Sequence, residues 1–277
     1  MLRITALMDN LPSENKALIA EHGLSLLIEK DGRSVLFDLG QGEHTLSNAR
    51  RLGRDIAHPD AVVLSHSHYD HAAGFRDYTE KIGGCELLYT GPGFFEPKYA
   101  FDGLKYTDLS CGFDEAFLKE KGIRHEIVED TKEILPGIHV AAGFPRIFDF
   151  ERIPERFVKF KKDGSGFIRD DFSDEVCLVL DLQDKICVLA GCSHPGILNM
   201  ITEVHRRFNK PVYAVFGGTH LVEADEDRIG KTILRLKDMG LEVAGFSHCS
   251  GSTVEDMIHS DRSMQICHLG TGDCIIL

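Results

Sequence analysis

Four metal-binding side chains lie within six residues of this sequence, in the segment His-Ser-His-Tyr-Asp-His at 66–71, directly after an apolar run. An extended strand end would place His66, His68 and Asp70 on one side, because strand side chains alternate. A turn at the end of the segment would direct His71 toward a second point. Imidazole and carboxylate ligands suit Zn, Mn or Fe. Four of them in one loop exceed what a single open catalytic ion usually takes, so we expect two adjacent divalent metal ions, with Zn favoured.

Three more apolar runs end in a small residue followed by a histidine, and these histidines are His194, His220 and His248. In sheets flanked by helices, ligands gather at the carboxyl ends of the strands. A single histidine after a strand is more often a surface or hydrogen-bonded residue. Together with segment 66–71, however, the three indicate loops that converge on one crevice.

Hydrophobic periodicity predicts sheets with helices outside them, an α+β chain. Strands are expected near 2–8, 24–29, 34–38 and 61–65, with an Asp-Gly hairpin turn at 30–33, a helix near 43–52 and another beginning near 71. From 176 onward we expect strands at 176–182, 185–190, 212–216 and 242–246, helices at 195–208, 225–239 and 252–259, and a final strand pair.

Most of the 17 phenylalanines fall between residues 90 and 172, a stretch with Gly and Pro punctuation. Such rings must be buried against something, either the main body or a partner subunit, which leaves a homo-oligomer open. They could also form a lid over the crevice. Because the candidate ligands run from His66 to His248, we expect one domain, 1–277, that carries an aromatic-rich insertion or lid at about 90–172.

The composition restricts the partners of the chain. A formal charge of −13 disfavours nucleic acid and anionic membrane surfaces. No segment has the apolar length of a transmembrane helix, and the N-terminus meets an acid too early for a signal peptide. Cys177, Cys187, Cys267 and Cys274 lie in apolar strands, and no Cys-x-x-Cys pair occurs. We therefore expect buried, reduced thiols in a cytoplasmic protein.

Segment 66–71, the earlier Phe-Asp-Leu-Gly at 37–40 and the strand-end histidines resemble the metallo-β-lactamase superfamily. This resemblance covers the chain and implies a four-layer αββα sandwich with a one- or two-metal site. It implies that His66 and His68 hold one metal, that Asp70, His71 and His248 hold the other, and that Asp38 orients the site. We assign His194 as the remaining ligand of the first metal. Cys192 stands where a bridging carboxylate is usual, as a thiolate ligand or as a buried thiol.

Motifs at 21–25, 144–151, 192–197, 217–221 and 248–251 resemble the group named for dihydropterin ribofuranosylaminobenzene phosphate synthase. Within these motifs, Arg146 and Glu151 are candidates for substrate binding. The lysines near 159–162 could neutralise a phosphate, although a charged turn is more often simply solvated.

The leading hypothesis is a metal-dependent hydrolase of a small anionic organic substrate, a phosphoester or a pterin-like compound, that uses a metal-activated hydroxide. Asp70 would hold a metal and orient the water, and His220 would bind the oxyanion or protonate the leaving group. One alternative is a synthase or transferase that acts on a phosphoribosyl or pterin substrate. Another is a non-hydrolytic di-iron redox or metal-sensing protein, although the chain has no flavin-binding segment.

Overall fold

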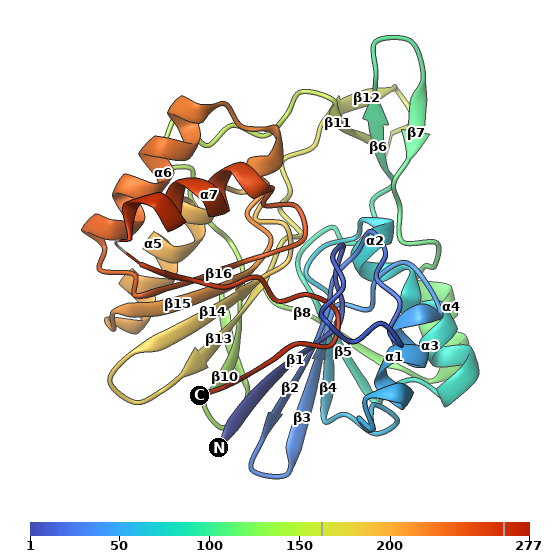
Figure 1. The fold of residues 1–277 in the computed structure, drawn as a ribbon. Helices are drawn as coiled ribbons and strands as arrows, with labels where there is room; N and C mark the ends of the chain where they lie inside the picture. Colours follow the sequence, from blue (N-terminus) through green and yellow to red (C-terminus); the bar gives the residue numbers. More distant parts are fainter. Residues whose placement is uncertain (162, 263) are drawn as a thin grey trace. The chain divides into compact units, whose positions relative to one another are not determined.

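The computed structural model describes residues 1–161, 163–262 and 264–277, and the chain forms two compact units (Figure 1). The first unit contains Met1–Ile127, Pro154–Asp174 and Gly270–Leu277. The second contains Val128–Ile153 and Glu175–Leu269. Each unit has its own seven-stranded sheet and its own hydrophobic core. The α+β class predicted from the sequence is therefore confirmed.

The main sheet of the first unit has the strand order β18-β1-β2-β3-β4-β5-β8. Its strands are β1 (Leu2–Met8), β2 (Ser25–Lys30), β3 (Arg33–Phe37), β4 (Ala61–Val63), β5 (Leu87–Thr90), β8 (Arg124–Ile127) and β18 (Cys274–Ile276). Neighbours from β18 to β3 are antiparallel, and those from β3 to β8 are parallel. Parallel neighbours need crossover connections, which contain α1 (His44–Arg51), α2 (Tyr69–Ala72), α3 (Gly74–Ile82) and α4 (Glu115–Lys121).

The expected hairpin between β2 and β3 is present. Asp31 and Gly32 both have positive φ angles, 51° and 79°. This backbone matches a two-residue type I′ turn, for which Asp-Gly is a favoured pair.

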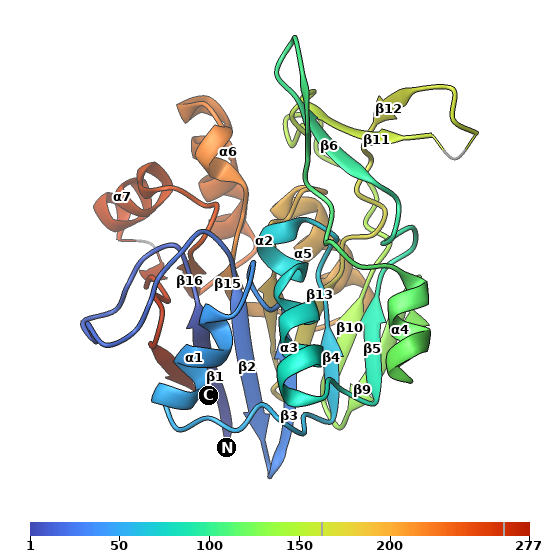
Figure 2. The same cartoon turned by 90° about the vertical axis from the view of Figure 1, so that its right-hand side faces the viewer.

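A second, four-stranded sheet in the first unit has the order β12-β11-β6-β7 (Figure 2). Its strands are β6 (Lys98–Phe101), β7 (Tyr106–Asp108), β11 (Phe157–Phe160) and β12 (Phe167–Arg169). The rings of Tyr106 and Phe167 stack with centroids 3.9 Å apart. Residues 90–172 thus contribute to three different sheets, because β8 joins the main sheet of this unit and β9 and β10 belong to the second unit. That the stretch at about 90–172 acts as an insertion or lid of a single domain stays a prediction.

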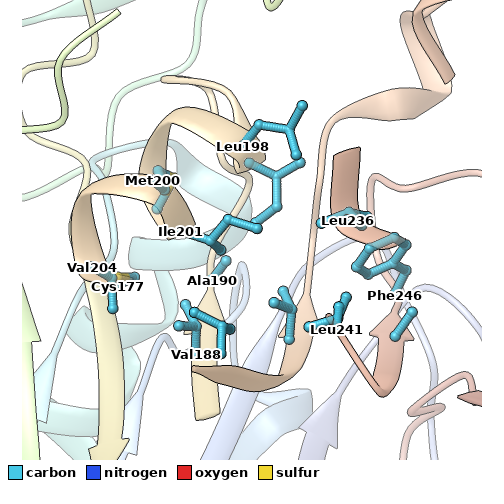
Figure 3. Close-up of a cluster of buried hydrophobic side chains, with 14 of the residues drawn as sticks. Cys177, Val188, Ala190, Leu198, Met200, Ile201, Val204, Leu236, Leu241 and Phe246 are labelled. Carbon is cyan, nitrogen blue, oxygen red and sulfur yellow. The ribbon is translucent and has the colours of Figure 1, made fainter. Parts of the chain in front are cut away.

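The sheet of the second unit has the order β17-β16-β15-β14-β13-β10-β9. Its strands are β9 (Thr131–Leu135), β10 (Ile138–Ala141), β13 (Cys177–Asp181), β14 (Ile186–Ala190), β15 (Val212–Gly217), β16 (Val243–Phe246) and β17 (Gln265–Ile266). The helices are α5 (Ile197–Phe208), α6 (Glu226–Asp238) and α7 (Ser252–Asp261), with a 3₁₀ turn η1 (Leu221–Glu223). Apolar side chains of α5, including Ile201 and Val204, meet Val188 of β14 in the core (Figure 3).

The strand topology of the second unit brings the later histidines to one edge. Neighbouring strands β14, β15, β16 and β17 are parallel. The loops that leave β14, β15 and β16 therefore emerge from the same edge of the sheet, at the carboxyl ends of the strands. Each of these loops carries one of the three histidines singled out in the sequence.

Two sequence expectations need correction. The last two strands do not pair with each other: β17 pairs with β16, whereas β18 pairs with β1 in the other unit. Cys177 and Cys187 are buried as expected, but Cys267 is half-buried and Cys274 is exposed. Cys274 lies on an edge strand, where an alternating pattern leaves one face open.

Among the described residues, no helix combines the length and apolar character that a bilayer crossing requires.

Candidate functional site

Segment 66–71 changes from extended to helical backbone in the middle of the predicted cluster. Strand β4 ends at Val63, and His68 is still extended, with φ −67° and ψ 145°. Asp70 and His71 then lie in the short helix α2, whose first turn closes when His68 O accepts from the backbone N–H groups of His71 and Ala72. The expectation that Asp70 shares a strand face with His66 and His68 is therefore wrong. A helix turn brings Asp70 beside His71 instead, with 3.7 Å between Asp70 Oδ2 and His71 Nε2.

The imidazoles of this segment form a tight, buried group in the first unit. The ring of His66 lies 4.7 Å from that of His68 and 4.3 Å from that of His71, between centroids. All three side chains and that of Asp70 are buried. Phe157 and Phe172 contact the His68 ring from the aromatic stretch, at 5.4 and 5.3 Å between centroids. An apolar wall thus excludes water from one side of the cluster.

Asp38 and Ser65 orient these rings. Asp38 Oδ2 accepts from His71 Nδ1 at 2.7 Å and from Ser65 Oγ at 2.7 Å, while Asp38 Oδ1 accepts from the Ser65 backbone N–H. Ser65 Oγ also lies 2.9 Å from Nδ1 of His66. With Nδ1 engaged in both rings, Nε2 is the nitrogen that would bind a metal. A carboxylate that holds a ligand imidazole in this way fixes its tautomer and raises its basicity.

The electrostatics of the two rings differ. Burial and the neighbouring His71 and His68 hold the pKa of His66 well below its usual value, so this ring is neutral. Burial also disfavours the charged form of His71, but the carboxylates of Asp70 and Asp38 outweigh it and raise the pKa of His71. A divalent cation and a proton would compete for the same negative surroundings. Neutral imidazoles beside a carboxylate are the donor set that Zn, Mn or Fe takes, so the residues fit a metal.

His22 is a member of this cluster to which the sequence analysis gave no role. Its Nε2 lies 3.1 Å from Asp70 Oδ2, and about half of its side chain is exposed (52%). The hydrogen bond that His22 donates to the Asp70 carboxylate raises the pKa of His22 despite partial burial. The motif at 21–25 was the available signal, but only the fold brings it next to Asp70: Leu24 N donates to Asp70 O.

In the second unit, the loops after β14 and β15 bring His194 and His220 together. Their rings lie 4.5 Å apart between centroids, and both side chains are buried, as is that of His248. His220 and His248 adopt left-handed backbone conformations, with φ 50° and 54°. Such conformations are uncommon for residues other than glycine and concentrate at functional sites.

Glu175 organises the loop that carries Cys192 and His194, and no sequence motif pointed to it. Its carboxylate accepts from the backbone N–H groups of Cys192 at 3.2 Å, of Ser193, and of His194 at 2.9 Å. Buried N–H groups need acceptors, and one carboxylate offers enough lone pairs to accept charge-assisted hydrogen bonds from all three. The carboxylate therefore fixes the turn from which His194 projects.

The two candidates for substrate binding make contacts inside the second unit. Glu151 is buried and accepts from the backbone N–H groups of Leu198 and Asn199, so it caps the N-terminus of α5. Arg146 Nη1 donates to His194 O at 3.3 Å. A role for either in substrate binding stays a prediction.

The basic turn at 159–162 belongs to the first unit. Lys159 Nζ lies 2.9 Å from Glu96 Oε2 and 2.8 Å from Asp171 Oδ1, and Lys162 lies outside the described residues.

Comparison with known proteins agrees with this arrangement. The sequence model described as the metallo-beta-lactamase superfamily matches residues 18–105, which include the whole of segment 66–71. A protein of Methanocaldococcus jannaschii named only as uncharacterized is 32% identical over 250 residues, which cover 90% of each chain. The chain belongs to the metallo-β-lactamase superfamily.

Two further relatives of this superfamily member carry functional names. The 7,8-dihydropterin-6-methyl-4-(beta-D-ribofuranosyl)-aminobenzene-5′-phosphate synthase of M. jannaschii is 29% identical over 287 residues, which cover 99% of this chain and 96% of the relative. A crystal structure described as a metal-dependent hydrolase of the β-lactamase superfamily is 27% identical, with a TM-score of 0.85 over 100% and 99% of the two chains. The metallo-β-lactamase fold predicted from the sequence is therefore confirmed.

Proposed function

We propose that this chain is a metal-dependent hydrolase of a small anionic organic substrate, a phosphoester or a pterin-like compound. The observation that carries the proposal is the buried group of His66, His68, His71 and Asp70, with Asp38 behind it. Burying several imidazoles and a carboxylate together is costly, and titratable groups gathered in this way are typical of functional sites. The similarity to a protein described as a metal-dependent hydrolase supports the same reading.

Each residue of the cluster has a distinct part in this proposal. His66, His68, His71 and Asp70 would hold two divalent ions, with Zn favoured over Mn or Fe. When bound, such ions lower the pKa of a water molecule and polarise the bond under attack. Asp38 and Ser65 keep the imidazole nitrogens directed, and Phe157 and Phe172 exclude water from one side. That His194 and His248 supply further ligands, with Cys192 as a candidate, stays a prediction of the sequence.

His220 is proposed to act on the substrate rather than on a metal. An imidazole can donate a proton to the leaving group or stabilise a developing oxyanion, which commonly contributes about 100- to 1000-fold to the rate. We therefore expect His220→Gln to lower kcat by about that factor and to leave the metal content unchanged. Loss of metal in this variant would instead make His220 a ligand.

Metal analysis joined to a substrate screen tests the proposal. Protein purified without added metal is assayed for Zn, Mn and Fe and then with phosphodiesters, phosphomonoesters and lactones. Asp70→Ala should lose one metal equivalent and the activity together. Asp184→Ala, an exposed aspartate in the β13–β14 turn, is the matched control and should retain both. A wild-type protein that hydrolyses substrate at full rate without metal would exclude the mechanism.

The further ligands are tested by counting the metal ions bound per protein molecule in His194→Ala and His248→Ala. The exposed His259→Ala is the control for both variants.

A synthase is the second candidate, because the named M. jannaschii relative is a synthase. The same metal site could polarise a phosphoribosyl or pterin substrate for condensation. The two reactions differ in their products. Turnover in ¹⁸O-labelled water places the label in the product of a hydrolase, whereas a synthase joins two organic molecules without net incorporation.

A further inference from the structure

A buried lysine lies between two buried aspartates behind segment 66–71. Lys98 Nζ is 2.8 Å from Asp170 Oδ2 and 2.7 Å from Asp174 Oδ1, and all three side chains are at most 3% exposed. Burial opposes the charge on Lys98, but the two carboxylates outweigh it and raise the lysine pKa. The lysine is therefore a permanent cation. All three residues belong to the first unit.

Asp174 connects this charged triad directly to the candidate ligands. Its second oxygen, Oδ2, accepts from the backbone N–H of Ser67 at 3.0 Å. The Ser67 N–H lies in the peptide plane between His66 and Ser67, so this hydrogen bond fixes the backbone directly after His66 and directly before the residue that precedes His68 in the extended segment. A charge-assisted hydrogen bond at this N–H therefore fixes the imidazoles more firmly than a neutral acceptor would.

The segment from Asp170 to Asp174 also contacts the rings themselves. Asp170 Oδ1 accepts from Phe172 N at 2.8 Å, and Phe172 has a left-handed backbone with φ 50°. The turn presses the Phe172 ring edge-on against His68, at 5.3 Å and 87°, while Lys98 Nζ lies 4.4 Å above the same ring. Lys98 thus holds both ends of a turn that packs behind the cluster.

An ordinary contribution to stability does not account well for this arrangement. Replacing a buried ion pair by apolar groups of similar size is often neutral or stabilising, so buried charges are weak evidence for a stability role. The stronger, charge-assisted hydrogen bond that a carboxylate accepts from the Ser67 N–H gives a specific reason for Asp174. The lysine then compensates the charge that this acceptor brings into the interior.

We propose that Asp174, held by Lys98, is a positioning residue for His66 and His68. The inference rests on the proposed metal site and deepens it. Asp170 offers a matched comparison: like Asp174 it neutralises Lys98, but its other oxygen binds Phe172 N instead of a loop N–H. The two aspartates therefore share a charge environment and differ in what they hold.

The test compares Asp174→Asn with Asp170→Asn by Zn²⁺ competition against a chromophoric chelator. Partners behind the ligands typically change metal affinity by about 10- to 100-fold. We expect Asp174→Asn to raise the Zn²⁺ Kd by about that factor and Asp170→Asn to change it by less than about threefold, with similar losses in Tm. Equal changes in Kd for the two variants would overturn the proposal.

A second measurement separates this inference from the proposed function. In metal-free protein, the ¹⁵N signals of the His66 imidazole, which directly precedes Ser67, should shift or broaden in Asp174→Asn and remain in place in Asp170→Asn. If wild-type protein binds no Zn²⁺, the proposed function fails, and unchanged imidazole signals in Asp174→Asn would then overturn the positioning role as well. If Asp174→Asn does not fold, the neutral pair Lys98→Gln/Asp174→Asn replaces it in both measurements.

Discussion

Asp38 Oδ2 lies 2.7 Å from Nδ1 of His71, and both side chains are completely buried. The two residues are far apart in the sequence, at the end of β3 and in α2. Asp38 has a left-handed backbone, with φ 57°, which turns its carboxylate toward His71 and Ser65. Aspartate and asparagine tolerate this conformation better than most residues. The carboxylate therefore orients a candidate ligand at the cost of local strain.

Removing this carboxylate should weaken metal binding more than it weakens the fold. We expect Asp38→Ala to raise the Zn²⁺ Kd by about 10- to 100-fold, because the His71 ring loses the group that fixes its tautomer. Asp38→Asn tolerates the same backbone and keeps one oxygen acceptor, so its effect should be intermediate. Chelator competition measures the Kd, and circular dichroism checks folding. An Asp38→Ala protein that binds Zn²⁺ like wild type would refute the role.

Continuous apolar runs made the strands of the second unit predictable. Strands β13, β14 and β15 are short, almost fully buried runs of apolar residues, and the parallel order of β14, β15 and β16 explains why their histidines share an edge. The strands of the four-stranded sheet could not be found in the same way. Strands of three or four residues, such as β7 and β12, show too little of a period, and their aromatic residues suit several structures.

The contacts that complete the candidate site could not be predicted either. Asp174 binds Ser67 across 107 positions of sequence, and Glu175 binds three N–H groups of the loop at 192–194. A carboxylate in a sequence carries no sign of which backbone N–H it will meet. Asp70 was misplaced for a related reason: a four-residue helix is too short to produce a periodic signal.

Gly74 should tolerate no side chain, because α3 begins against the backbone next to the candidate site. A Cβ at Gly74 would lie 2.1 Å from Leu39 O. Gly74→Ala therefore forces α3 away from the turn that follows Asp38, and we expect a loss of roughly 1 to 3 kcal/mol. Gly230→Ala is the control, because only Met257 Cε, at 3.9 Å, is near and α6 gains helix propensity. In thermal unfolding, the Tm should fall for Gly74→Ala and rise for Gly230→Ala. Equal decreases in Tm for the two variants would contradict the steric argument.

Glu203 should make the fold sensitive to acid. Hydrogen bonds from Arg206, together with Arg207 and against the effect of burial, lower the pKa of Glu203 from 4.5 to about 2. A lowered pKa in the folded state gives stability above the unfolded value that is lost as pH falls from about 4.5 through 2. This contribution to the free energy of unfolding is up to about 3 kcal/mol. The free energies of unfolding of wild type and Glu203→Gln, measured in urea across this pH window, should converge at low pH. A difference that stays constant with pH would rule out the ion pairs of Glu203 as its source.

Glu151 should show the opposite dependence on pH. Burial raises its carboxyl pKa from 4.5 to about 7, against the two backbone N–H groups of α5 and the more distant Arg228 and Arg146. A raised pKa means that the folded protein holds the proton more tightly, so this stability is complete below about 4.5 and is lost as pH rises through 7. Glu151→Gln cannot titrate, and the stability of wild type relative to this variant should fall between these two values.

Glu151→Ala separates the capping role from the titration. It leaves the N–H groups of Leu198 and Asn199 without their acceptor, and Gly196 with φ 99° gives no side chain to replace it. A lost helix cap costs roughly 1 to 2 kcal/mol. We therefore expect Glu151→Ala to be less stable than Glu151→Gln at every pH from 4 to 8 in urea titrations, since Gln keeps one acceptor oxygen. Equal stability of the two variants would mean that water replaces the cap, and the buried acid would then need another explanation.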